Sequence, residues 1–196
     1  GGAENVAVSA LTKRGIPLVH IIRNAEAVAE FTLGMMLAET RNIARSHHKI
    51  RMGEWTTDFC NTEFTSTLSN MTVGIVGLGN IGALLAKKLH ALNVKVLGYD
   101  GFLPGAVVKT MPVEPVEALE DIFQRADIIS IHLRLTAENR GMIGRELISQ
   151  MKETSYLINA SRAGLIDEDA LLNALQLHKI AGAALDVFEE EPLEAG

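Results

Sequence analysis

Short, continuously apolar runs alternate with stretches of helical periodicity from residue 73 onward. A run that is apolar throughout, rather than at every second position, is typical of a strand buried on both faces of a parallel sheet. Repeated βαβ units of this kind predict an α/β fold with a doubly wound parallel sheet. The runs predict strands at 73–76, 94–99, 127–133, 155–159 and 180–185, and the stretches between them predict helices at 81–92, 116–125, 144–151 and 168–178.

The chain before residue 73 follows a different pattern. Residues 4–13 are predicted to be a helix and residues 16–22 a strand. A long helix is then predicted to begin at Asn24, whose side chain can cap it, and Glu26 suits the positive end of its dipole. Cationic residues crowd the far end of this helix at 41–49, where the dipole favours positive charge.

The apolar residues of this long helix cover more than one narrow stripe, which predicts burial on two sides. We expect one side to pack on the chain's own sheet and the other on a second subunit; a plain core helix is the alternative. Residues 53–70 predict an irregular arm, in which Trp55 is a packing or dimer anchor. These features predict a homodimer. The apolar residues in question are Val28, Phe31, Leu33, Met35, Met36 and Leu37.

Composition narrows the partners. With 18 Lys and Arg against 24 Asp and Glu, the formal net charge of −6 argues against binding to nucleic acid or to an anionic membrane surface. The apolar share of 47% excludes a disordered chain, and no apolar stretch is long enough to span a bilayer. The one cysteine, Cys60, excludes a disulfide framework and favours a reducing, cytoplasmic setting. His47 and His48 lack a carboxylate partner at helical spacing, so no metal site is predicted.

The sharpest motif is a glycine-rich loop at 77–82, with the sequence Gly-Leu-Gly-Asn-Ile-Gly, which follows the first of these strands directly and opens a helix. Gly77 permits a tight turn, Gly79 lets the backbone approach a pyrophosphate, and Gly82 lets the helix pack closely on the strand. Free amides at the helix start then face the phosphates. This context predicts a dinucleotide-binding domain of the Rossmann type.

An acidic residue, Asp100, ends the next predicted strand. A carboxylate at this position can accept hydrogen bonds from both hydroxyls of the adenine ribose, and it would repel a 2′-phosphate. The predicted cofactor is therefore NAD rather than NADP. The alternative is a structural glycine turn with a surface aspartate.

Further segments bring an enzyme family into view. The chain contains Asn-Ala-Glu-Ala-Val-Ala-Glu at 24–30 and, after the glycine loop, Ile-Asn-Ala-Ser-Arg-Ala-Gly-Leu-Ile-Asp-Glu at 158–168. It then contains Ala-Leu-Asp-Val-Phe-Glu-Glu-Glu-Pro at 184–192. In this order the segments resemble the NAD-binding domain of the D-isomer-specific 2-hydroxyacid dehydrogenases, and the likeness covers nearly the whole chain. The last two segments are far more specific than the glycine loop.

The resemblance implies two domains. Residues 23–196 correspond to the NAD-binding Rossmann domain, with an interdomain helix and dimer arm at 23–70. Residues 1–22 correspond to the end of a second, substrate domain, in which Gly1 and Gly2 would meet the substrate carboxylate.

The resemblance also implies a reaction, the transfer of a hydride between nicotinamide and C2 of a D-2-hydroxy acid. Arg162 stands at the family's catalytic arginine, whose planar guanidinium can grip a substrate carboxylate in a bidentate way. Glu191 stands at the glutamate that orients a catalytic histidine and raises its pKa. Asp186 falls at the nicotinamide end of the cofactor. The remaining implied cofactor contacts are Asn80, Ile81, His132, Leu133, Ala160, Ser161 and Arg162.

The chain departs from the family pattern at several points. None of its histidines stands at the position of the catalytic histidine, so we expect it to be part of a longer protein. Arg134 replaces a usual proline, Ala163 replaces a usual glycine, and the stretch 20–23 lacks the usual Pro-Gly. These changes affect the fine geometry of the active site rather than the fold. The residues that distinguish one acid from another are expected mostly in the substrate domain.

Two other functions are compatible with parts of the pattern. One is a non-enzymatic NAD-sensing dimerisation module related to the same family, which could keep both Arg162 and Glu191. Turnover of a 2-keto acid would distinguish it from an enzyme. The other is a Rossmann methyltransferase, which Asp100 would allow but which gives no reason for the segments at 158–168 and 184–192.

Overall fold

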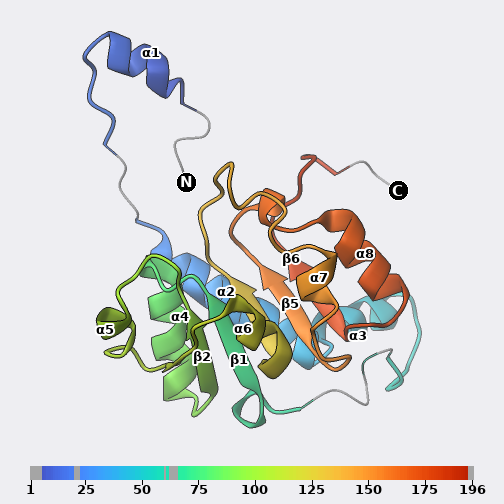
Figure 1. Ribbon diagram of the computed structural model, residues 1–196. Coiled ribbons are helices and arrows are strands. Elements are labelled where there is room, and N and C mark those ends of the chain that lie inside the picture. The colour runs from blue at the N-terminus through green and yellow to red at the C-terminus, as the bar shows by residue number, and fades with distance from the viewer. Residues whose placement is uncertain (1–5, 20–22, 60, 62–65, 194–196) are drawn as a thin grey trace.

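The computed structural model describes residues 6–19, 23–59, 61 and 66–193. In this part of the chain, six strands pair in parallel to form one sheet with the order β3-β2-β1-β4-β5-β6 (Figure 1). The chain builds the sheet outward from β1 in one direction and then returns to build it outward from β4. Ligands of doubly wound sheets bind where this reversal occurs, beyond the carboxyl ends of the strands. The strands are β1 (Thr72–Val76), β2 (Lys95–Tyr99), β3 (Glu114–Pro115), β4 (Ile128–Ile131), β5 (Tyr156–Asn159) and β6 (Gly182–Leu185).

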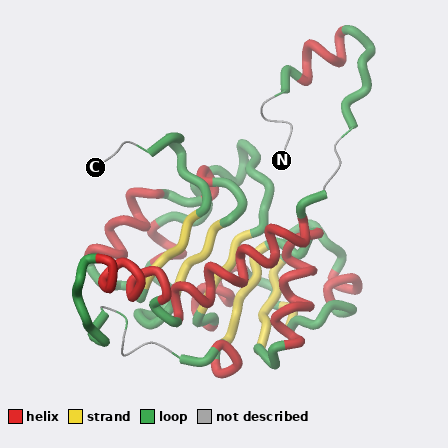
Figure 2. Tube along the Cα trace, turned by 180° about the vertical axis from the view of Figure 1, so that it is seen from behind, coloured by secondary structure: helices red, strands yellow, loops and turns green. Residues whose placement is uncertain are grey.

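Helices cover both faces of the sheet (Figures 1 and 2). On one face, α2 (Ala25–Thr40) and α4 (Asn80–Ala91) pack against each other and against the strands. On the other face lie α6 (Leu119–Arg125), α7 (Arg145–Ile148) and α8 (Glu168–Gln176). Short turns of helix complete the chain at α5 (Gly105–Val108), η2 (Leu68–Asn70) and η3 (Ala163–Leu165).

Two apolar clusters explain why the strands are apolar at every position. Ile128 packs in the cluster under α2 and α4, whereas the next residue, Ile129, packs in the cluster under α6, α7 and α8. Leu157 and Ile158 divide in the same way. The five predicted strands are confirmed to within two residues at each end. The sixth strand, β3, escaped prediction because its two residues are polar or proline and offer no apolar run.

The predicted helices after residue 73 are confirmed, but three are shorter than expected: α6 begins three residues later than predicted, α8 ends two residues earlier, and α7 is the shortest. The range 144–151 contains only the four-residue helix α7, because the backbone after it tightens into hydrogen bonds between residues three apart. The N–H groups of Gln150 and Met151 donate to the carbonyls of Leu147 and Ile148. No helix in the described part of the chain is long and apolar enough to cross a bilayer.

The long helix predicted from Asn24 is two helices, so that prediction is wrong. α2 ends at Thr40, and α3 (Ile43–Arg51) begins after Asn42, whose φ of 54° lies in the left-handed region. Asparagine tolerates this conformation better than most residues, so it can redirect the chain here. The cations predicted at the far end of one helix therefore belong largely to α3. Asn24 does occupy the N-cap position of α2, but its side chain makes no capping hydrogen bond.

One side of α2 is buried, as predicted, and the other faces outward. Ala29 and Met36 are fully buried against the sheet and α4. On the opposite side Phe31 is 51% exposed and Leu37 is also exposed. In the irregular arm that follows α3, Trp55 is 88% exposed. Burial of the second side by another subunit stays a prediction.

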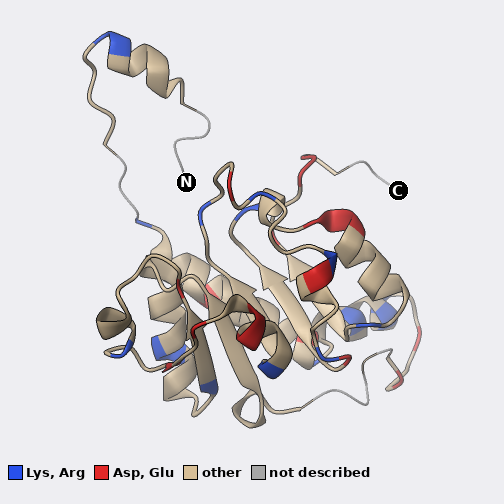
Figure 3. Cartoon of the chain, in the orientation of Figure 1, with Lys and Arg blue, Asp and Glu red and all other residues tan. Residues whose placement is uncertain are grey.

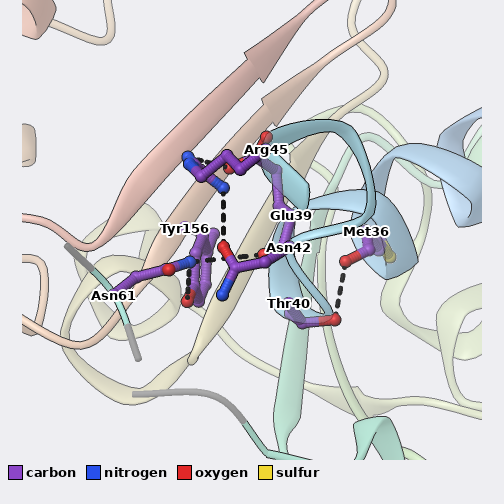
Figure 4. Close-up of polar contacts among 7 residues, drawn as sticks. All are labelled: Met36, Glu39, Thr40, Asn42, Arg45, Asn61 and Tyr156. Atoms are coloured by element: carbon purple, nitrogen blue, oxygen red, sulfur yellow. Dashed lines mark hydrogen bonds and ion pairs between the residues drawn. The ribbon is translucent and has the colours of Figure 1, made fainter. Parts of the chain in front are cut away.

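A buried polar cluster lies where the end of α2, the start of α3 and the amino end of β5 meet (Figure 4). The side-chain amide of Asn61 donates to the Tyr156 hydroxyl at 3.0 Å and to the Glu39 carbonyl oxygen at 3.3 Å. Arg45 donates to the Glu39 carboxylate at 2.8 Å and to the Asn42 side-chain oxygen at 3.2 Å. Since Asn61 and Tyr156 are fully buried, these contacts attach the arm and the α2–α3 turn to the sheet.

The N-terminal segment differs from its prediction. α1 (Val8–Lys13) lies within the predicted helix 4–13 and buries none of its residues; it stands apart from the sheet (Figures 1 and 2). The predicted strand 16–22 is wrong for residues 16–19, which are exposed and form no strand. Gly1, Gly2, residues 20–22 and Cys60 lie outside the described residues. The domain boundary after residue 22 stays a prediction.

Candidate cofactor and active site

The glycine loop joins the end of β1 to the start of α4. Gly77 has a φ of 96°, and its N–H donates to the Tyr99 carbonyl at 2.8 Å. A Cβ at this position would lie 2.8 Å from the carbonyl oxygen of His132, so the turn has no room for a side chain. Gly77 therefore provides the tight turn predicted for it.

The other two glycines of the loop differ from each other. A Cβ at Gly82 would lie 2.0 Å from the carbonyl oxygen of Gly77, which explains how α4 packs so closely on the end of β1. A Cβ at Gly79 would meet no atom within 4 Å. Gly79 is the N-cap of α4, so open space adjoins the N–H groups of the first helical turn. An anionic pyrophosphate fits such a site.

Asp100 follows β2 directly and reaches across to the glycine loop. One carboxylate oxygen accepts a hydrogen bond from the N–H of Leu78 at 2.8 Å. The other accepts from the N–H groups of Phe102 at 2.9 Å and Leu103 at 3.0 Å. A carboxylate offers about four acceptor positions, so about one stays available for a ribose hydroxyl. The sequence predicted hydrogen bonds to both ribose hydroxyls, which would need two available acceptor positions.

His132 lies just beyond β4, and its backbone N–H donates to the Val76 carbonyl at 2.8 Å. The Nε2 atom is 2.9 Å from the Ser130 hydroxyl, and the Nδ1 atom is buried with no hydrogen-bond partner among the described residues. Burial lowers the pKa of His132 to about 4, so the imidazole is neutral at pH 7. A Cβ at Gly77 would lie 3.0 Å from Cδ2 of the next residue, Leu133. His132 and Leu133 thus form a wall beside the glycine loop.

Arg162 lies in a turn at the carboxyl end of β5. Asn159, the last residue of β5, fixes this turn, because its side-chain nitrogen donates to the Arg162 carbonyl at 2.9 Å. The Asn159 side-chain oxygen accepts from the N–H of Ser161 at 3.0 Å and from its hydroxyl at 2.8 Å. The half-buried Arg162 donates through Nη1 to the Ser161 carbonyl at 2.7 Å. Ala160 packs against the apolar cluster under α2 and α4.

The segment after β6 contains the other two predicted residues. The N–H of Asp186 donates to the Asn159 carbonyl at 3.0 Å, so the pairing of β5 with β6 continues to this point. Glu191 is exposed, and its carboxylate accepts from the N–H of Phe188 at 3.0 Å. Glu189, between them, pairs with Arg140 at 2.6 Å.

Since the strands are parallel, the loops that hold these predicted residues leave from one edge of the sheet. Figure 3 shows charged residues of both signs on the loops at this edge. Sequence reasoning did not assign roles to Asn159 or to the Leu78 N–H, which orient Arg162 and Asp100. Asn159 lies within the segment 158–168 that carries the family resemblance, and this position was the signal that could have identified it. Among the described residues, no group of three or more His, Cys, Asp or Glu side chains could hold a metal ion.

Comparison with known proteins decides the family. Residues 33–196 match the D-isomer specific 2-hydroxyacid dehydrogenase, NAD binding domain. The chain belongs to this family. It is 42% identical over 193 residues to D-3-phosphoglycerate dehydrogenase of Methanocaldococcus jannaschii. The aligned region covers 97% of this chain and 36% of that protein. It is also 42% identical over 195 residues to glyoxylate reductase of Thermofilum pendens. Here the aligned region covers 98% of this chain and 57% of that protein.

Solved structures of D-lactate dehydrogenases share the fold. The Aquifex aeolicus enzyme, complexed with NAD and lactic acid, superimposes with a TM-score of 0.83 at 32% identity over 97% of this chain and 56% of its own. The Lactobacillus jensenii enzyme with NAD+ gives 0.84 at 27% identity over 100% of this chain and 59% of its own. The predicted Rossmann fold and the predicted cofactor, NAD, are therefore confirmed. The chain spans 36% and 57% of the length of these two curated relatives.

Proposed function

We propose that the protein containing this chain is an NAD-dependent oxidoreductase of D-2-hydroxy acids, similar to the phosphoglycerate dehydrogenases. It transfers a hydride between nicotinamide and C2 of the hydroxy acid or 2-keto acid. The observation that supports this function most is the position of Arg162. The turn after β5 holds this arginine at the same sheet edge as the glycine loop, where a cofactor and an anionic substrate can meet.

The described residues fit NAD. The open space at Gly79 and the N–H groups at the start of α4, including Asn80 and Ile81, suit the pyrophosphate. Asp100 suits the adenine ribose, and the pair His132 and Leu133 suits the wall beside it. When bound, NAD supplies the hydride acceptor, and the side chains of the domain supply orientation and charge. Ala160, Ser161 and Asp186 are proposed to line the part of the site toward the nicotinamide.

Arg162 is proposed as the residue that holds the substrate. A guanidinium can donate two parallel hydrogen bonds to a carboxylate, which fixes both the position and the plane of the acid. The same cation polarises the adjacent carbonyl of a 2-keto acid and stabilises the negative charge that develops on its oxygen. Asn159 assists by fixing the backbone of the turn, so that the guanidinium starts from one position.

Glu191 is proposed to act on a histidine from another part of the protein. A carboxylate beside an imidazole stabilises the imidazolium, so it raises the pKa of the histidine and selects its orientation. That histidine then exchanges the hydroxyl proton of the substrate. The hydrogen bond from the Phe188 N–H holds the Glu191 carboxylate in one place for this task.

The assembly and its setting belong to the same proposal. The exposed outward side of α2, with Phe31 and Leu37, and the exposed Trp55 support a homodimer. Gly1 and Gly2 are proposed to contact the substrate carboxylate from the second domain. A cytoplasmic location fits the single cysteine of the chain.

Turnover by the full-length protein tests this function. NADH oxidation would be followed with glyoxylate, hydroxypyruvate, pyruvate and phosphohydroxypyruvate as separate substrates. Reduction of at least one of these acids is the expected result. Tight NADH binding without reduction of any 2-keto acid would instead support the NAD-sensing module.

A further inference from the structure

The segment between β4 and α7, residues 134–143, lies against the turn that follows β5. The N–H of Gly141 donates to the Gly164 carbonyl at 2.8 Å. A parallel β-bridge then joins Ile143 to Ile166. These contacts place Arg140, which precedes Gly141, directly beside the turn.

The guanidinium of Arg140 lies across Gly164. A Cβ at Gly164 would be 2.9 Å from Nη1 of Arg140 and 3.1 Å from its Cζ. Any side chain at position 164 would therefore displace the guanidinium from its present position. Gly164 is buried and lies two residues after Arg162, so Arg140 rests on the same turn as the proposed substrate-binding arginine.

From this position Arg140 reaches the segment that holds Glu191. Its Nη1 atom is 2.6 Å from the carboxylate of Glu189. The N–H of Glu189 donates to the carboxylate of Glu168, at the start of α8, at 3.1 Å. Glu189 is thus held through its side chain by Arg140 and through its backbone by Glu168. Arg140 and Glu168 both adjoin the Arg162 turn. Glu191 lies two residues after Glu189 in the chain.

We propose that Arg140 is a positioning residue, which joins the Asp186–Glu191 segment to the Arg162 turn and so sets the separation of Arg162 from Glu191. This inference rests on the proposed function. The side chains of Arg140 and Glu189 are 59% and 47% exposed, and an ion pair this exposed adds little to the stability of a fold. Small displacements of reacting groups, in contrast, change rates strongly, so the effect of the pair lies in geometry.

The test uses the full-length protein and the variants Arg140→Ala, Glu189→Ala and their double. Each single variant is expected to lower kcat/KM by about tenfold, mostly through kcat, because Arg162 and Glu191 no longer act on the same substrate pose. The double variant is expected to lose no more than either single one, because both remove the same contact. Arg140→Lys, which keeps the charge, is expected to recover part of the loss.

The pH profile separates positioning from a structural role. In the direction of hydroxy-acid oxidation the neutral histidine is the base. If Glu191 is held less well, the pKa of that histidine falls, and the acid limb of kcat/KM moves to lower pH. Arg140→Ala should therefore move this limb in the same direction as Glu191→Gln, but by less.

A matched control is available in the exposed pair of Arg125 with Glu114, whose side chains are 42% and 44% exposed. Arg125→Ala should leave kcat/KM within about twofold of the unmodified protein. The proposal is overturned if Arg140→Ala behaves like this control, if the losses of Arg140→Ala and Glu189→Ala add in the double variant, or if the acid limb does not move.

A protein that binds NADH but reduces no 2-keto acid would remove the proposed function without deciding the contact itself. Hydrogen exchange then decides it. Arg140→Ala should speed the exchange of amides at 186–190 while Arg125→Ala does not, and unchanged exchange in Arg140→Ala would refute the joining of the two segments.

Discussion

The two edges of the sheet use polar residues in opposite ways. At the amino edge, Asn61 and Tyr156 are fully buried and hydrogen-bonded to each other, and Arg45 pairs with Glu39 beside them (Figure 4). At the carboxyl edge, Arg162 is only half-buried and Gly79 adjoins open space. The first arrangement pairs most of its polar groups within the fold, although the Asn61 side-chain oxygen is buried with no hydrogen-bond partner among the described residues. The second orients charged groups, and at Gly79 it leaves room for a ligand.

This difference makes the effects of substitutions separable. A polar group whose partners are all within the fold contributes to the free energy of unfolding, because its loss leaves a buried partner unpaired. A charged group held only in orientation contributes mainly to binding and rate. Substitutions at the amino edge should therefore change stability, and substitutions at the carboxyl edge should change function.

The largest expected effect is at Arg162. In the full-length protein, Arg162→Lys should lower kcat/KM by about two to three orders of magnitude, or roughly 3–4 kcal/mol, because lysine lacks the planar fork that fixes a carboxylate. Steady-state kinetics measure this change, while NADH affinity and Tm should stay unchanged. Arg145→Lys, at an exposed position on α7, is the matched control. An activity loss that is matched by a loss of Tm would break the separation of the two edges.

The amino edge should show the reverse. Asn61→Ala removes the hydrogen bond to the buried Tyr156 hydroxyl and should lower the free energy of unfolding by about 1–3 kcal/mol. Urea unfolding of the chain measures this loss, and NADH affinity should be unaffected. The exposed Asn173 on α8 provides the control, since Asn173→Ala should change stability by less than about 0.5 kcal/mol.

His132 sharpens the comparison, because it is a group at the carboxyl edge that behaves as if it were in the core. Its pKa is about 4 in the folded protein against 6.5 as the ordinary value. Between these values the unfolded chain binds the extra proton, so stability should fall as the pH falls from 6.5 to 4. We expect this residue to account for about 2 kcal/mol of that loss. Unfolding free energies measured across this range should show a smaller slope for His132→Gln, and an equal slope would contradict the burial of the imidazole.

The smallest expected effect concerns cofactor choice. Asp100→Asn removes the charge and replaces one of the two accepting oxygens with an amide nitrogen that cannot accept, so NADH should bind about threefold to tenfold more weakly and its margin over NADPH should narrow. Fluorescence titration of both cofactors measures the change. Asp58→Asn, in the exposed arm, should alter neither affinity. A preference of the unmodified protein for NADPH would show that Asp100 does not select NAD.

The fold was predictable because the two core clusters require a recognisable pattern of apolar residues in the sequence. Ile128 and Ile129 face different helical layers, so their strand is apolar throughout and can be recognised from the sequence alone. The break between α2 and α3 produces no such pattern in the sequence. It depends on one asparagine, Asn42, in the left-handed region, and an asparagine inside a helical pattern is common.

The candidate site was predictable where chemistry demands one residue type. Gly77 and Gly82 leave no space for a Cβ, so their spacing could be recognised. The partners that orient the site were not predictable, because Arg140 and Glu189 lie far apart along the chain and meet only through the fold. Which of these residues bind NAD and substrate stays a prediction.

The hydrogen bond between the Leu78 N–H and Asp100 has a thermodynamic consequence. The glycine loop and the Asp100 carboxylate, which is proposed to bind the adenine ribose, are already joined within the protein, so the proposed site for the adenosine half of NAD is partly organised before NAD binds. Binding then loses little conformational entropy in the protein, and more of the contact energy appears as affinity. Because the Leu78 amide and the carboxylate share one hydrogen bond, a substitution that disturbs either group should weaken both of the proposed contacts, to the phosphates and to the ribose.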